Sequence, residues 1–339
     1  MTGSATIRAA LAGCLFLALA APAPAAEIAA RIEYDFVARP AGLPADLAAP
    51  AGADLRFLAI KALDGSPVDA ALWQPGGKTP AATTLVVSIH GSGGSYHAHP
   101  NGFLGRGLAA KGYAVLGINT RQTGVRVNTD NLLDVRRDLE AAVYTARALG
   151  YRTLVLHGHS LGNIQVQLYA GTTWDADVKA VVLTGMFANL PWKSRHLLVQ
   201  DEENFRQLGE AAFKALREGK AAEVLPVRMG WITGQKVPLT GQHFLSYRWE
   251  PTSVADGTYW IRRIPRPILL VRDAGDAVIE PFEPYMLLSA ATSAGSLVPS
   301  IKFTLLPNPK GRSAAAHVFT DSQQPLVDAI AAWLAEQKL

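Results

Sequence analysis

The chain has 339 residues, of which 49% are hydrophobic and 18% charged, and this composition excludes an intrinsically disordered protein. The length permits one large α/β domain or two smaller ones with a substantial core. The formal net charge is only +4 and the basic residues are spread along the chain, so we expect no nucleic-acid partner.

Residues 1–25 have the pattern of a secretory signal peptide. Arg8 precedes an apolar run over residues 9–20, and Ala23-Pro24-Ala25 forms a small-x-small cleavage pattern. The run is too short to span a bilayer, so we expect an exported protein, periplasmic or secreted, with no stable membrane span. Leu11-Ala12-Gly13-Cys14 also matches a lipobox, but the apolar run continues beyond the cysteine, which argues against a lipoprotein.

Cys14 is the only cysteine of the chain. Cleavage near Ala25 leaves a mature protein without cysteine, and therefore without a disulfide, a cysteine nucleophile or a thiolate metal site.

After a lead-in over residues 26–53, rich in proline and alanine, segments with strand and helix patterns alternate. Near-continuous apolar runs, such as residues 83–89, are typical of strands buried on both faces. The predicted strands are 55–62, 68–74, 83–89, 113–118, 153–157, 178–184, 267–272 and 301–306, and the predicted helices are 104–111, 132–149, 163–170, 204–217 and 325–334. This alternation predicts a mainly parallel sheet flanked by helices, built from residues 54–185 and 264–339.

Residues 186–263 interrupt the alternation and contain no clear β-α unit. Four of the seven tryptophans occur in this segment: Trp192, Trp231, Trp249 and Trp260. We interpret the segment as a largely helical lid, inserted over the carboxyl edge of the sheet. In the alternative interpretation the aromatic residues form a small core of the insertion itself, and the two interpretations are compatible.

The most informative motif is Gly158-His159-Ser160-Leu161-Gly162, which lies between a predicted strand and a predicted helix. This context predicts a nucleophile elbow, a tight turn in which nearly side-chain-free neighbours leave the serine hydroxyl exposed. The side chain of His159 is expected to point away from that hydroxyl.

Together these patterns resemble the α/β-hydrolase superfamily, and the resemblance extends over essentially the whole mature chain. The superfamily places a nucleophile, an acid and a histidine in this order along the chain. The resemblance implies that Ser160 is the nucleophile. His317, the only histidine beyond His243, precedes the last predicted helix and is implied to be the base, although alanine stands before it where relatives commonly have glycine.

The acid is expected in the turn after the strand 267–272. The register of the superfamily selects Asp276, while Asp273 stands where glycine is usual and is the alternative. The resemblance also implies an oxyanion hole formed by two backbone N–H groups. Ser92, within the glycine-rich segment 90–95, and Leu161 are the residues expected to supply them.

These residues predict an exported serine hydrolase that cleaves a carboxylic ester through an acyl-enzyme intermediate. The expected partner is a small-molecule ester with an apolar or aromatic acid, and no cofactor is expected. No metal is expected either, because His97 and His99 have no carboxylate near them in the sequence. The alternatives are the same triad acting on an amide or peptide, a thioester or a carbon–carbon bond, and a non-catalytic hydrolase-like binding protein.

Overall fold

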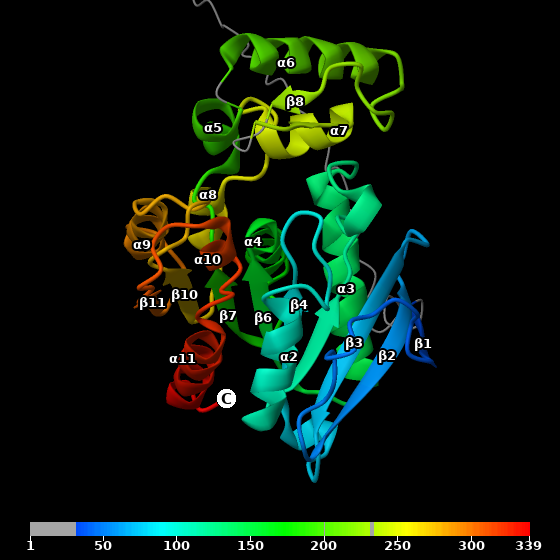
Figure 1. Ribbon diagram of the computed structural model, residues 1–339, viewed down its shortest axis with the longest axis vertical. Helices are drawn as coiled ribbons and strands as arrows, with labels where there is room; N and C mark the ends of the chain where they lie inside the picture. The colour runs from blue at the N-terminus through cyan, green and yellow to red at the C-terminus, as the bar shows by residue number, and fades with distance from the viewer. Residues whose placement is uncertain (1–31, 200, 231–233) are drawn as a thin grey trace, which may run out of the picture.

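A computed structural model of the chain describes residues 32–199, 201–230 and 234–339 (Figure 1). The expected signal peptide (residues 1–25) and Trp231 lie outside these residues. A nine-stranded sheet occupies the centre of the described chain, and no described helix is long and apolar enough to cross a membrane.

The strands of the sheet lie in the order β1-β2-β3-β5-β4-β6-β7-β10-β11. In chain order they are β1 (Glu33–Val37), β2 (Ala53–Lys61), β3 (Pro67–Pro75), β4 (Thr84–Ile89), β5 (Ala114–Ile118), β6 (Thr153–His159), β7 (Val178–Thr184), β10 (Ile268–Asp273) and β11 (Ile301–Leu306). The pairs from β5 to β11 are parallel, whereas β1, β2 and β3 pair antiparallel with their neighbours. The mainly parallel sheet that the sequence predicts is thus confirmed.

Two layers of helices cover the sheet. One face packs against α3 (Leu132–Ala148), α4 (Leu161–Thr173) and α9 (Glu283–Thr292), and the other face packs against α2 (Asn101–Ala110) and α11 (Gln323–Glu336). Alternate residues of β6 divide between the two cores: Leu154 and Leu156 belong to one and Val155 to the other. By the same alternation, His157 and His159 lie on the face of α2 and α11.

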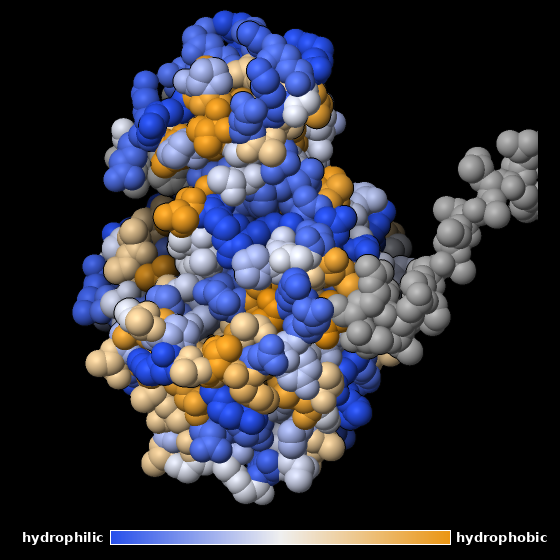
Figure 2. Space-filling view, turned by 90° about the vertical axis from the view of Figure 1, so that its right-hand side faces the viewer, coloured by the Kyte–Doolittle hydropathy of each residue, from blue (hydrophilic) through white to orange (hydrophobic). Residues whose placement is uncertain are grey.

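The segment between β7 and β10 leaves the sheet and forms a separate layer above its carboxyl edge (Figure 1). This layer contains α5 (Leu190–Lys193), α6 (Glu202–Arg217), β8 (Met229–Gly230), β9 (Lys236–Val237), α7 (Gly241–His243) and two short π-helices, Ser194–Leu198 and Phe244–Arg248. The chain then returns to the core through α8 (Gly257–Ile261), which packs against α4 and α9 (Figure 1). Figure 2 shows this layer as an upper lobe with mostly hydrophilic outer residues.

The insertion has a small apolar core of its own. Phe205 stacks on Trp249 with ring centroids 5.4 Å apart, and Phe244 packs edge-on against Phe205 at 5.2 Å. The indole N–H of Trp260 donates to a carbonyl oxygen within the insertion. These aromatic side chains therefore serve packing, as in the alternative interpretation of the sequence, and Trp192 is the exposed one among the described tryptophans of the insertion.

Candidate active site

Ser160 lies in the turn between β6 and α4, at the carboxyl edge of the sheet. Its backbone angles, φ 52° and ψ −120°, lie in a region that residues with a side chain rarely adopt. A Cβ atom on Gly158 would lie 2.5 Å from the carbonyl oxygen of Gly162, and one on Gly162 would lie 2.6 Å from the carbonyl oxygen of His90. Both glycines are therefore needed for a turn that carries the serine into the site.

A continuous hydrogen-bond chain joins Ser160 to His317 and Asp276. The Ser160 hydroxyl donates to Nε2 of His317 at 2.9 Å, and Nδ1 of His317 donates to Oδ2 of Asp276 at 2.9 Å. Ser160 and His317 are each 8% exposed and Asp276 is fully buried. The structure thus brings together the three residues that the resemblance selected, in the geometry of a serine, a base and an orienting acid.

The turn of Asp276 holds its carboxylate in place. Oδ1 accepts hydrogen bonds from the amides of Val278 and Ile279, at 2.8 and 2.9 Å. Burial would raise the pKa of Asp276, but the charge interaction and hydrogen bond with His317 and these two amides outweigh burial and hold the pKa below its usual value. The acid is therefore ionised when it faces the histidine.

Backbone hydrogen bonds lock the turn of Asp276 to the segment of His317. The amide of Ser313 donates to the carbonyl oxygen of Gly275 at 2.8 Å, and the amide of Ala277 donates to that of Ser313 at 3.2 Å. Ser313 also caps α10 (Ala314–His317), the short helix that ends at the histidine.

Asp273, the alternative acid, has a different role. Its carboxylate accepts hydrogen bonds from the amide of Gly275 at 2.8 Å, from Asn308 at 2.9 Å and from the hydroxyl of Ser322 at 2.5 Å. It is fully buried and no hydrogen bond joins it to His317 among the described residues. Asp273 therefore fixes the turn that carries Asp276.

The segment after β4 packs directly against the nucleophile. A Cβ on Gly91 would lie 2.8 Å from Cβ of Ser160, so only a glycine permits this approach. The amides of Ser92 and Leu161, the expected oxyanion donors, form no backbone hydrogen bond among the described residues and follow Gly91 and Ser160 directly. They are therefore available to a ligand.

His90 shapes this segment, a role that sequence reasoning missed. Its Nδ1 donates to the carbonyl oxygen of Gly91 at 2.6 Å, while Nε2 accepts from the amide of Thr120 at 3.1 Å. The hydroxyl of Thr123 lies 3.0 Å from Nε2 and donates to the carbonyl oxygen of Gly94 at 2.8 Å. Burial is the largest cause that lowers the pKa of His90 to about 4, so the ring stays neutral and keeps Nε2 as an acceptor. In the sequence, the position of His90 directly before the glycine-rich segment was the only indication of this role.

A second serine–histidine hydrogen bond occurs deeper in the sheet, between Ser88 Oγ and His157 Nδ1 at 2.8 Å. The other ring nitrogen of His157 contacts the hydroxyl of Thr184 at 3.0 Å, so no carboxylate orients this histidine. Both residues are 1% exposed, and burial lowers the pKa of His157 to about 3. This pair therefore lacks the acid and the access that a hydrolytic site requires.

Apolar side chains surround the first turn of α4 and the acid turn. Leu161 belongs to a buried cluster that also contains Ile164, Phe187, Leu190 and Ile279. Phe187 and Leu190 come from the start of the insertion and Ile279 follows Asp276. The immediate surroundings of the site are therefore apolar on this side.

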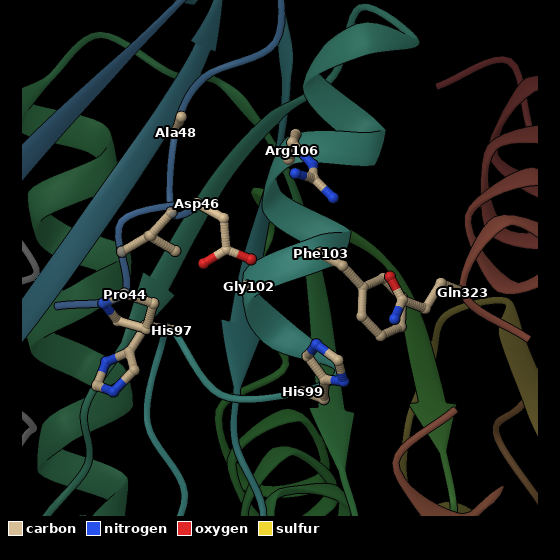
Figure 3. A pocket seen from close by; sticks show the side chains of 10 residues that line it. Pro44, Asp46, Ala48, His97, His99, Gly102, Phe103, Arg106 and Gln323 are labelled. Carbon is tan, nitrogen blue, oxygen red and sulfur yellow. The ribbon is translucent and has the colours of Figure 1, made fainter. Parts of the chain in front are cut away.

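A separate pocket lies between residues 44–48 and α2 (Figure 3). It encloses about 330 Å³ and is lined on its polar side by Asp46, His97, His99, Arg106 and Gln323. None of the residues joined to Ser160 lines it. Although Asp46 shares the pocket with the two histidines, the described residues contain no group of three metal-ligating side chains close enough to hold an ion.

Comparisons with known proteins agree with this architecture. A family model described as the alpha/beta hydrolase fold matches residues 84–236, from the strand before the glycine-rich segment into the insertion. The chain has the α/β-hydrolase fold. A search of curated proteins gives no match.

Several solved structures share the fold. Est1E from Butyrivibrio proteoclasticus, solved with ferulic acid, is 19% identical over 81% of this chain and 96% of its own, with a TM-score of 0.60. An esterase domain from a Rhodothermus marinus protein is 21% identical over 83% and 98%, with a TM-score of 0.54. A hypothetical protein from Pseudomonas aeruginosa is 18% identical over 88% and 100%, with a TM-score of 0.62. At these identities the likeness establishes the fold.

Proposed function

We propose that this chain is a serine hydrolase that cleaves carboxylic esters of small molecules. The observation that carries the proposal is the hydrogen-bond chain from Ser160 through His317 to the buried, ionised Asp276. Similarity to an esterase domain from Rhodothermus marinus supports an ester as the substrate.

The chemistry follows from the arrangement. Nε2 of His317 takes the proton of Ser160 while the hydroxyl oxygen attacks the acyl carbon, and Asp276 stabilises the imidazolium that forms. The amides of Ser92 and Leu161 hold the oxyanion, and removing one such donor typically costs about 10²–10³ in turnover. His317 then protonates the departing alcohol, and water activated by the same ring hydrolyses the acyl-enzyme.

Labelling with a fluorophosphonate tests the proposal directly. The wild-type protein should form one adduct, on Ser160, and lose its activity toward p-nitrophenyl esters. Ser160→Ala should not label and should lower kcat by about 10⁶, because the triad acts as a unit. The matched control is Ser296→Ala, which removes a half-buried hydroxyl that donates to the carbonyl oxygen of Arg262 and accepts from the amide of Val298.

A comparison of esters with matched amides and thioesters identifies the bond. We expect hydrolysis of the ester to exceed that of the matched amide, because an alkoxide leaves more readily than an amine. A protein that labels but prefers the amide would be a serine hydrolase of another class. A protein that neither labels nor hydrolyses any of these substrates would contradict the proposal and favour a binding function.

We further propose that the acid part of the substrate is apolar or aromatic. The cluster of Leu161, Phe187 and Ile279 beside the acid turn and the first turn of α4 supports this, and Est1E has been solved with ferulic acid, an aromatic acid. In a series of p-nitrophenyl esters, kcat/KM should rise several-fold per added methylene until the space is filled. A maximum at acetate would contradict this assignment.

We also propose export, on the pattern of residues 1–25. The amino terminus of the protein recovered from a host that expresses the full chain should begin after Ala25. Cys14→Ser should give the same terminus, since lipidation is not expected. Recovery of an intact amino terminus from a competent host would contradict export.

A further inference from the structure

His159, the residue before the nucleophile, lies against the catalytic base. Its ring lies beside the ring of His317, with centroids 5.0 Å apart and planes at 42°. Gly185, at φ 53°, makes room for both rings, because a Cβ there would lie 3.0 Å from one and 3.1 Å from the other. The two histidines are therefore in direct packing contact.

A chain of hydrogen bonds across the sheet holds His159. Asn101, at the start of α2, donates to Ser88 Oγ at 2.9 Å, and Ser88 contacts His157 Nδ1 at 2.8 Å. The hydroxyl of Thr184 then links Nε2 of His157, at 3.0 Å, to Nδ1 of His159, at 3.2 Å. All five residues are at most 2% exposed, so water does not compete for these bonds.

The direction of one bond in this chain is fixed by its donor. The amide nitrogen of Asn101 can only donate, so Ser88 Oγ accepts there. The bonds of His157 and His159 to Ser88 and Thr184 join hydroxyls and ring nitrogens, each of which can donate or accept.

The ring of His159 is uncharged in the folded protein. The titratable groups around it are His317, His157 and His90. Burial is the largest cause that lowers the pKa of His159 well below its usual value, and repulsion from His317 lowers it further. A neutral ring can pack against His317 without opposing the positive charge that His317 takes up from Ser160.

We propose that His159 is a positioning residue for the reaction: held by the chain of hydrogen bonds from Asn101 to Thr184, its ring fixes the orientation of His317 toward Ser160. This role rests on the proposed hydrolase function and adds to it a second support for the base, independent of Asp276. Asp276 holds His317 at Nδ1, whereas His159 holds it by contact with the ring.

Three variants and one control test this role. In His159→Ala we expect kcat to fall about 10- to 100-fold with KM changed less than about two-fold, because misplacement of a catalytic group acts on the chemical step. Thr184→Val breaks the chain and His159→Phe keeps an aromatic ring without the nitrogen that bonds to Thr184, so both should show smaller losses, about 3- to 10-fold. The control is Thr145→Val, since Thr145 is a buried threonine of α3 whose hydroxyl has no partner among the described residues.

The pH profile separates positioning from a merely structural role. In His159→Ala, water replaces the ring and stabilises protonated His317, so the acid limb of kcat/KM should move to higher pH. A structural role would lower Tm and leave this limb unchanged.

The two proposals fail differently. If wild-type protein labels with fluorophosphonate and hydrolyses esters while His159→Phe and Thr184→Val match its kcat and acid limb, the role of His159 is overturned and the hydrolase function stands. If wild-type protein does neither, the function and this role are both overturned. His159→Phe and Thr184→Val change few atoms, so they decide the question even where His159→Ala does not fold.

Discussion

The acid turn shows how two neighbouring carboxylates take separate roles. Asp276 receives two backbone amides on one oxygen and His317 on the other, whereas Asp273 binds a backbone amide, an asparagine and a serine. Asp276 thus orients the base, and Asp273 orients the turn that carries Asp276. Substitution of Asp276 should therefore lower kcat, whereas substitution of Asp273 should mainly lower the free energy of unfolding.

Asp276→Asn should lower kcat by about 10⁴ with little change in KM, because an amide in place of the carboxylate no longer selects the productive tautomer of His317. Asp273→Asn should mainly lower the free energy of unfolding, by about 1–3 kcal/mol, since the hydrogen bonds that it accepts are weakened. Steady-state kinetics and urea denaturation of both variants measure the two effects. A loss of about 10⁴ in kcat for Asp273→Asn, with Asp276→Asn near wild type, would reverse the assignment.

At the residue scale the sequence contains enough information to place Ser160, Asp276 and His317, because the superfamily fixes their order and each follows a recognisable strand or precedes a helix. The contacts of His90 and His159 could not be predicted, since they depend on neighbours brought together by sheet order. Ser88 pairs with His157 across β4 and β6, and Thr184 pairs with His159 across β6 and β7.

At the element scale, the insertion is joined to the core through buried charged and polar groups. Lys193 of α5 forms an ion pair with Glu283 at the start of α9, and the two side chains are 1% and 2% exposed. In a second set of buried polar contacts, Asp130 of the core accepts a hydrogen bond from the hydroxyl of Tyr247 at 2.8 Å and contacts His243 at 3.2 Å. These buried contacts attach the insertion to the core next to the active site.

Removing one partner of the buried pair should be costly. Lys193→Met leaves Glu283 without its cation, and we expect the free energy of unfolding to fall by about 3–5 kcal/mol. The double variant Lys193→Met/Glu283→Leu should recover most of this loss, because no buried charge is left unpaired. Urea denaturation of the single and double variants measures both values.

The matched control is Lys302→Met, which breaks an exposed pair with Glu336 and should change stability by less than about 1 kcal/mol. If Lys193→Met were as neutral as Lys302→Met, the pair would not anchor the insertion.

The accuracy of the sequence-based elements follows their burial. The predicted strand 178–184 coincides with β7, because buried strands of a parallel sheet are short apolar runs between loops. The edge strand β1 was included in the lead-in, since its five residues are mostly exposed and mix polar with aromatic side chains. The short strands β8 and β9 and the π-helices have no pattern in sequence, because tertiary contacts decide them.

At the scale of the whole molecule, the α/β framework buries an unusual set of neutral histidines. Four of the eight histidines, His90, His157, His159 and His243, are at most 2% exposed. Burial is the largest cause that lowers the pKa of each of them, to about 4 for His90 and about 3 for His157. Burial keeps these histidine rings uncharged in the folded protein, and it therefore makes the free energy of unfolding depend on pH.

This dependence predicts loss of stability in mild acid. Since the folded-state pKa values lie below the unfolded value of about 6.5, the unfolded chain binds more protons as the pH falls below 6.5. The stability contributed by the four neutral histidines is full above this pH and is lost as the pH falls toward their folded pKa values. At pH 5 the loss is about 2 kcal/mol each for His90 and His157, against a typical total stability of about 5–15 kcal/mol.

We therefore expect the free energy of unfolding, measured with urea between pH 8 and 5, to be flat at first and then to fall steeply below pH 6.5. Substitution of the exposed His99 by Gln should leave this slope unchanged, because His99 is not one of the four buried rings. His243→Gln should make the slope shallower, since the variant unfolds without the proton uptake at that position. A stability that stays constant from pH 7 to pH 5 would show that these rings accept protons within the folded protein, and the neutral networks around Ser160 and His317 would then not persist at low pH.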